Sequence, residues 1–188
     1  MQHAKKVSKR TRLITGTTLA AAIAVGGFGA YSASAADSEP AAQAAAKPAA
    51  AKAGNTFESK HLTVDAATDA AQAVLKAAKK ENQKVSVAVV DRNGNTIVEL
   101  RGDGAGPQSP ESAVKKAYTA VSWNAPTSEL TKRLEQTPNL KDIPGTLFLA
   151  GGAPVAADNA PIAGIGVAGA PSGDLDEKFA QAGVATLK

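Results

Sequence analysis

Cysteine is absent from this chain of 188 residues, and methionine and tryptophan occur once each. Without cysteine there is no disulfide, no thiolate metal ligand and no cysteine nucleophile, so stability must come from core packing, a bound ligand or metal, or oligomerisation. Histidine is also scarce, with two residues, and no pair of histidines stands at metal-ligand spacing. The composition therefore offers no convincing catalytic constellation.

The first 35 residues have the pattern of a secretory signal peptide. Five basic residues and no acid precede Leu13, an uncharged run follows, and Ala33-Ser34-Ala35 supplies the small residues of a cleavage site. A transmembrane anchor is disfavoured because glycines interrupt the run, whereas a spanning helix needs about 20 strongly apolar residues. Residues 8–13 (SKRTRL) resemble a degenerate twin-arginine signal, so general secretion and twin-arginine export both stay open. We expect the mature protein to be secreted.

Removal of this segment changes the charge of the protein. The full chain has 21 basic and 17 acidic residues, and loss of the five basic ones leaves 16 against 17, a net charge of −1. The mature chain thus gives no support for binding to nucleic acid or to an anionic membrane. Its only histidine is His61, so a Ser/His/Asp triad would depend on that residue, and no G-x-S-x-G motif accompanies it.

Residues 36–55 are mainly alanine, proline and lysine, which predicts a disordered linker. The domain proper is expected over residues 56–188, and its hydrophobic patterns predict an α+β fold with a mainly antiparallel sheet. Strands are expected over 85–90, 96–100, 146–150, 151–155 and 162–169, with the turn of a hairpin at 91–95. Helices are expected over 64–78 with Thr63 as N-cap, from the N-cap Ser109 to Trp123, and over 128–136 and 174–187. Glycines in the last strand indicate that another segment approaches its backbone closely.

Four sequence blocks, in this order, resemble the GlcG/HbpS family of haem-binding domains, and the signal peptide makes the chain similar to its secreted HbpS-type members. The blocks are VAVVD with Asn93-Gly94 and RGDGA, then AVKKAYTA, then GGAPV, and finally IGVAG with Asp176-Glu177 and AQAG. The resemblance covers nearly all of residues 62–187. Ala150 and Gly102 depart from the residues that many relatives carry at those positions, and both substitutions would reshape a pocket.

The resemblance implies a profilin-like fold, with a sheet of about five strands flanked by helices. It also implies a homo-oligomer, expected to be an octamer, that binds haem or a related tetrapyrrole such as a corrinoid. HbpS-type members act as extracellular accessories to a redox-sensing histidine kinase, so roles in haem scavenging, iron handling and oxidative stress are expected. Two alternatives stay open. One is a haem-degrading enzyme, and the other is a protein-binding regulator of a membrane sensor in which the tetrapyrrole is incidental.

Haem iron takes histidine, methionine, cysteine or tyrosine as its axial ligand. The mature chain offers only His61 and Tyr118, because its other histidine and tyrosine lie in the signal peptide. A surface position for His61 and a packing role for Tyr118 are the alternatives. This inventory suits weak, reversible capture of haem, with a hydroxyl oxygen of Thr119 or Thr146 near the iron.

The haem propionates need cations, and Lys116, Lys115 and Arg101 are candidates, although most lysines of this kind lie on a solvated helix face. Trp123 and Phe148 would either stack on a macrocycle or belong to the core. Three acids near the start of the last helix could bind a metal ion, but favourable interaction with the helix dipole explains them equally well. We expect no nucleic-acid partner and no stable insertion into a membrane.

Overall fold

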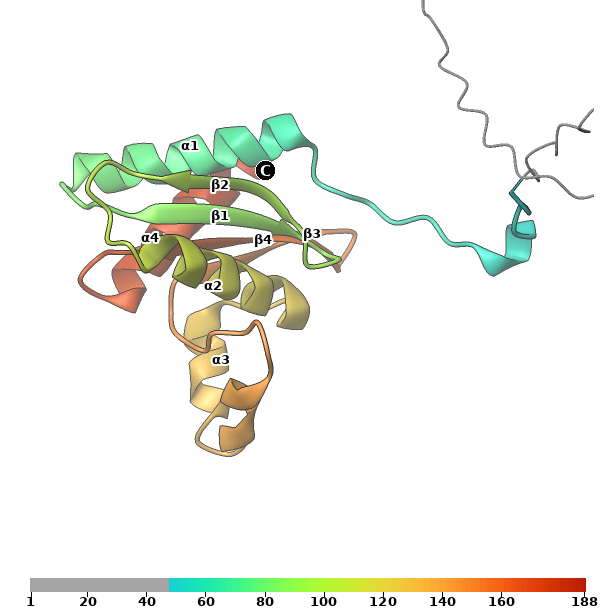
Figure 1. Cartoon of the computed structure of the whole chain (residues 1–188). Coiled ribbons are helices and arrows are strands. Elements are labelled where there is room, and N and C mark those ends of the chain that lie inside the picture. Colours follow the sequence, from blue (N-terminus) through green and yellow to red (C-terminus); the bar gives the residue numbers. More distant parts are fainter. Residues whose placement is uncertain (1–47) are drawn as a thin grey trace, which may run out of the picture. The chain divides into compact units, whose positions relative to one another are not determined.

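The computed structural model describes residues 48–188, so the predicted signal peptide and the linker up to residue 47 lie outside the described part. Residues 51–188 form one compact unit. Its helices are α1 (Val64–Lys80), α2 (Ser109–Trp123), α3 (Thr127–Arg133) and α4 (Gly173–Val184), with short 3-10 turns η1 (Ala53–Asn55), η2 (Pro138–Asp142) and η3 (Ala185–Leu187). Its strands are β1 (Ser86–Asp91), β2 (Thr96–Arg101), β3 (Gly152–Ala157) and β4 (Ala160–Ala168) (Figure 1).

The strands form one antiparallel sheet in the order β2-β1-β4-β3. This confirms the predicted α+β class, but the sheet has four strands and not about five. The strand expected over residues 146–150 is absent. The backbone N–H of Leu147 donates to Thr119 Oγ1 at 2.8 Å, and Phe148 is buried against the Trp123 ring. Because this segment is bonded to α2, it does not pair with the sheet.

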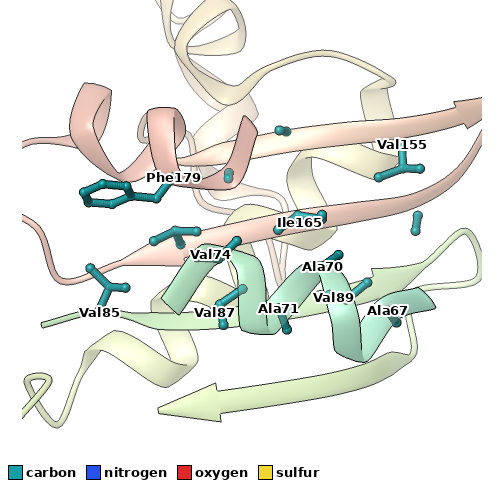
Figure 2. Close-up of a cluster of buried hydrophobic side chains, with 14 of the residues drawn as sticks. Ala67, Ala70, Ala71, Val74, Val85, Val87, Val89, Val155, Ile165 and Phe179 are labelled. Carbon is teal, nitrogen blue, oxygen red and sulfur yellow. The ribbon is translucent and has the colours of Figure 1, made fainter. Parts of the chain in front are cut away.

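One face of the sheet is covered by α1 and α4. Their apolar side chains meet those of β1, β3 and β4 in the main core, in which Val74, Val87, Ile165 and Phe179 are fully or almost fully buried (Figure 2). The alanines at 67, 70 and 71 on α1 are also fully buried, and they let that helix lie close to the strands. Burial of this surface is the main source of stability in a chain without disulfides.

The opposite face of the sheet is covered by α2, which lies unusually close to β4. A Cβ atom added to Gly166 would stand 2.0 Å from the carbonyl oxygen of Ala113, and one added to Gly164 would stand 2.2 Å from that of Ala117. No real side chain fits at such distances. The prediction that the glycines of this strand admit a close neighbour is therefore confirmed, and the neighbour is the backbone of α2.

The expected helix ends are mostly confirmed. Thr63 caps α1 by accepting from the N–H of Ala66 at 3.3 Å, as predicted. The prediction for α2 was wrong in one respect, because Gln108 occupies the N-cap position without a side-chain cap. Ser109 is instead buried, with its Oγ 2.8 Å from Ser86 Oγ and 2.7 Å from the carbonyl oxygen of Gly106. No helix within residues 48–188 is long and apolar enough to cross a membrane.

Candidate functional site

Tyr118, Thr146 and His61 lie at one end of the sheet. The β1–β2 turn (residues 91–95) and the β3–β4 turn (residues 158–159) are found at the same end. The ring of Tyr118 lies between two glycines of different segments. A Cβ on Gly94 would stand 2.9 Å from Tyr118 Cε2, and one on Gly145 would stand 3.7 Å from Cε1. The ring therefore extends from α2 between the β1–β2 turn and the loop after η2. The side chain is half-buried and packs partly against Val90, Ala117 and Val121.

Thr146 directly follows Gly145 and so belongs to the same surface as Tyr118. Its hydroxyl donates to the carbonyl oxygen of Ile143 at 2.7 Å, and the side chain is half-exposed. The oxygen keeps a free lone pair toward solvent, because a donating hydroxyl can still accept. Ile143 itself is 40% exposed, which adds an apolar group to this surface.

Thr119 has a different role from the one predicted. It is fully buried, donates to the carbonyl oxygen of Lys115 at 2.7 Å and accepts from the N–H of Leu147 at 2.8 Å. Its hydroxyl cannot reach a ligand in this conformation. It attaches the loop that carries Thr146 to α2, and it therefore positions the surface without forming part of it.

His61 precedes α1 and is exposed, and its Nε2 lies 2.8 Å from Ser59 Oγ. The neighbouring Lys60 forms an ion pair with Asp158 of the β3–β4 turn. This pair holds the segment at the same end of the sheet as the β1–β2 turn. His61 stands on the α1 side of that turn and Tyr118 on the α2 side, so one protomer does not join them in a single pocket.

Between them, Asp91 organises the β1–β2 turn. Its Oδ1 accepts from the N–H groups of Asn93 and Asn95, each at 2.8 Å, and its Oδ2 accepts from the Asn95 side-chain amide at 3.2 Å. Partial burial acts to raise the pKa of this carboxyl. The bonds from Asn95 and Asn93, together with the nearby charge of His61, outweigh that effect and hold the pKa below its usual value. Asp91 is therefore ionised at neutral pH, in the turn that touches the Tyr118 ring.

Lys116 is not available for a propionate in this conformation. Its side chain is 6% exposed, and its Nζ donates to Asp176 Oδ2 at 2.8 Å and to the carbonyl oxygen of Val167 at 3.0 Å. Burial raises the pKa of the Asp176 carboxyl, although the Lys116 charge and backbone N–H groups oppose the change. The pair joins α2 to α4 through the interior.

Arg101 lies far from Tyr118, Thr146 and His61. It ends β2, five residues beyond Thr96, which at about 3.3 Å per residue places it about 17 Å along the strand from the β1–β2 turn. Its Nε and Nη2 donate to the carbonyl oxygen of Ala105 at 3.1 and 2.6 Å. The two aromatic residues considered for stacking on a macrocycle pack against each other instead. The Trp123 and Phe148 rings meet edge to face, with centroids 5.1 Å apart.

Cavities of about 390, 250 and 330 Å³ are among those in the described part of the chain, and the six predicted site residues line none of these. The surface around Tyr118 and Thr146 is open to solvent, since both side chains are partly exposed. No group of three or more histidine, aspartate or glutamate side chains suited to a metal ion occurs among residues 48–188.

Comparison with known proteins identifies the family. A family model described as "Haem degrading protein HbpS-like" matches residues 62–185, about two thirds of the chain. The chain belongs to the HbpS-like family. The predicted relationship is confirmed, and the match spans the region from just before α1 to the end of α4.

Solved structures agree with this HbpS-like assignment. The crystal structure of a double mutant of Streptomyces reticuli HbpS is 70% identical to this chain, with a TM-score of 0.75, and the match covers 77% of this chain and 99% of the other. A PduOC:haem complex is 26% identical, with a TM-score of 0.62, and the match covers 68% of this chain and 95% of the other. An uncharacterised 15.0 kDa protein from the dhaT-dhaS intergenic region of Citrobacter freundii is 34% identical over 113 residues, 57% of this chain and 80% of that protein.

Glu177 has a structural role in this HbpS-like domain that the sequence did not reveal. Glu177 accepts from the N–H and the hydroxyl of Ser128 at 3.0 and 2.6 Å and from the N–H of Gly151 at 3.3 Å. It thereby fixes the start of α3 against the start of α4. No local signal could have revealed this, because the partners lie 49 and 26 residues away.

Proposed function

We propose that this protein is an exported, homo-oligomeric tetrapyrrole-binding protein that captures haem reversibly. Its physiological role would be haem scavenging, or support of an extracellular redox-sensing two-component system under oxidative stress. Membership of the HbpS-like family supports the choice of ligand, and so does the similarity to PduOC, which was crystallised with haem. The signal peptide predicted over residues 1–35 supports the location.

The observation that carries this proposal is the half-buried Tyr118 ring, which lies between Gly94 and Gly145. Because Gly94 and Gly145 carry no side chain, the β1–β2 turn and the loop after η2 pack closely against the two edges of the ring. Tyrosine oxygen and histidine nitrogen are both recognised haem-iron ligands. Tyr118 and His61 are therefore the residues that would hold the iron, and Thr146 and Ile143 would contact the macrocycle.

The open geometry explains why binding should be reversible. Haem held on a surface keeps part of its area in water, so less apolar surface is buried than in an enclosed pocket. A second protomer is the natural source of further contacts, because His61 and Tyr118 stand on different sides of the β1–β2 turn. The exposed Leu149, at 54%, and the unpaired edges of β2 and β3 are surfaces that an oligomer would cover. We expect the assembly to be an octamer.

Titration of the mature protein with hemin tests the proposal through the Soret band and the dissociation constant. We expect Tyr118→Phe, Thr146→Val and His61→Gln each to weaken binding by about threefold to tenfold without abolishing it, because each contact contributes about 1 kcal/mol. Arg101→Gln is the matched control, since Arg101 lies at the other end of β2, and its effect should stay below about twofold. Unchanged hemin and cobalamin spectra on mixing with the wild-type protein would exclude tetrapyrrole binding.

A second candidate function is haem degradation, which the description of the family suggests. It predicts that the Soret band of the haem-loaded protein decays when ascorbate and oxygen are supplied, with release of iron. A band that persists as long as that of haem-loaded serum albumin would rule this activity out.

The proposed link to a sensor kinase has its own test. Pull-down on the kinase's extracellular domain should recover the protein more strongly in the presence of hemin than without it. Equal recovery of the ligand-free protein would favour the alternative in which the tetrapyrrole is incidental. Sequencing of the secreted protein from its first residue should give Ala36, and size-exclusion chromatography should show one oligomer.

A further inference from the structure

A cavity of about 390 Å³ lies at the end of the sheet opposite to Tyr118. It is formed where α1 ends, where the chain turns into β1, and where the loop after β2 begins; Figure 1 shows these three segments together at one end of the molecule. Its lining consists of Leu75, Ala78, Lys79, Asn82, Gln83, Lys84, Val85, Gly102 and Asp103. The proposed haem surface does not involve this region.

The floor of the cavity is apolar. Leu75 packs against the main core and presents its exposed part to the cavity, whereas Ala78 and Val85 line the floor but are only 1% exposed. Gly102 leaves this floor open, because a Cβ there would stand 3.5 Å from Leu75 Cδ2. The same Cβ would stand 2.7 Å from the Val85 carbonyl oxygen, which already accepts from the Gly102 N–H at 2.9 Å. The end of β2 therefore cannot carry a side chain that would cover the floor.

The rim of the cavity is cationic. Lys79 and Lys84 line it, and neither forms an ion pair within residues 48–188, where the paired lysines are Lys60, Lys115, Lys116 and Lys178. The Lys84 chain lies along the loop after β2, since a Cβ on Gly104 would stand 3.0 to 3.4 Å from its Cδ, Cε and Nζ. Asp103 is the one acid in the lining.

The geometry points to a binding site for a small anion with an apolar body, such as a medium-chain carboxylate or an aryl sulfonate. The apolar part lies on Leu75, Ala78 and Val85, and the anionic group lies between the ammonium groups of Lys79 and Lys84. Charge-assisted hydrogen bonds of this kind are stronger than neutral ones. The volume lies within the range of about 300–1,000 Å³ that is usual for small-molecule sites. This site is independent of the haem surface at the other end of the sheet.

The test uses the mature full-length protein and 8-anilino-1-naphthalenesulfonate, with octanoate as the competing ligand. We expect a fluorescence increase on binding that octanoate reverses. The double variant Lys79→Gln/Lys84→Gln should weaken binding of the sulfonate by about fivefold or more, because it removes both partners of the anionic group. Circular dichroism checks that the fold is retained, which we expect because both side chains are exposed.

The matched control is Lys76→Gln/Lys80→Gln, which removes the same charge from exposed positions of α1 that do not line the cavity. Its affinity should change by less than about twofold, because general attraction falls off with distance and salt. Equal weakening by the two double variants would overturn the site, since it would show attraction by net charge alone. Absence of octanoate-reversible fluorescence in the wild-type protein would overturn it as well.

Discussion

Lys116 on α2 donates a hydrogen bond from Nζ to Asp176 Oδ2 on α4 at 2.8 Å, and the two side chains are 6% and 5% exposed. The contact joins residues 60 positions apart and passes the end of β4, where Lys116 also binds the Val167 carbonyl oxygen. It links the helix on one face of the sheet to a helix on the other. A buried pair of this kind makes each partner depend strongly on the other.

Lys116→Met should therefore destabilise the domain by about 3–5 kcal/mol, because it leaves the Asp176 carboxylate buried without its cation. The free energy of unfolding in urea measures the effect. Lys115→Met is the matched control, since Lys115 pairs with Glu111 on the exposed face of the same helix, and its cost should stay below about 0.5 kcal/mol. If Lys116→Met/Asp176→Leu is no more stable than Lys116→Met, the loss does not come from the orphaned charge.

Gly166→Ala should be among the most damaging single substitutions in the chain. The added Cβ would stand 2.0 Å from the Ala113 carbonyl oxygen, so α2 must move away from β4. We expect a loss of more than about 3 kcal/mol, since both groups belong to backbone in regular structure and neither can rotate away. Thermal and urea unfolding measure this. Gly54→Ala, where a Cβ meets nothing within 4 Å, provides the control and should be nearly neutral.

Gly94→Ala should act through Tyr118. The residue has φ +89°, which disfavours any side chain, and its Cβ would stand 2.9 Å from Tyr118 Cε2. We expect a cost of about 1–2 kcal/mol in the native protein. A double-mutant cycle separates the cost of the backbone conformation from the cost of the contact with Tyr118. Replacement of Tyr118 by alanine removes the contact but leaves the backbone conformation of residue 94 unchanged. If the cost of Gly94→Ala is unchanged in that background, the cost comes from the backbone conformation alone and the two residues are not coupled.

The lowered pKa of Asp91 should make the free energy of unfolding depend on pH. The pKa of its carboxyl is lowered by folding, so its contribution is fully present above the unfolded value of 3.8 and is lost as the pH falls through the folded value. Asp91→Ala should therefore destabilise the protein at pH 6 and do so less at about pH 2.5, because protonation of the wild-type carboxyl removes its contribution as the pH falls through the folded pKa. Urea unfolding at both values gives the comparison. An equal cost of Asp91→Ala at the two pH values would show that ionisation of Asp91 plays no part.

Local patterns in the sequence were sufficient for most of the fold. The N-cap at Thr63, the alternating strand at residues 85–90 and the turn at 91–95 each depend on neighbours within a few residues, and all three appear as expected. The strand predicted at 146–150 was wrong because an apolar run of five residues does not specify its partner. Thr119, 28 residues away from Leu147, provides the hydrogen bond that a sheet would have provided.

The candidate site was predictable only as a set of residue types. The inventory of haem ligands pointed to His61 and Tyr118, and the structure places both at one end of the sheet. The sequence could not reveal that Thr119 and Lys116 are buried, because their positions on the inner side of α2 depend on contacts with Leu147 and Asp176. Family resemblance singled out Lys116 as a candidate to bind a propionate, whereas in the structure its ammonium group is paired with Asp176 in the interior.

The sequence by itself determined the class of the fold, the order of its elements and its membership of the HbpS-like family, because capping, alternation and turn chemistry act over short distances along the chain. The tertiary structure alone decided which polar side chains face solvent and which are paired inside. That choice depends on the approach of α2 to Gly164 and Gly166, and such an approach is set by the packing of surfaces far apart in the sequence.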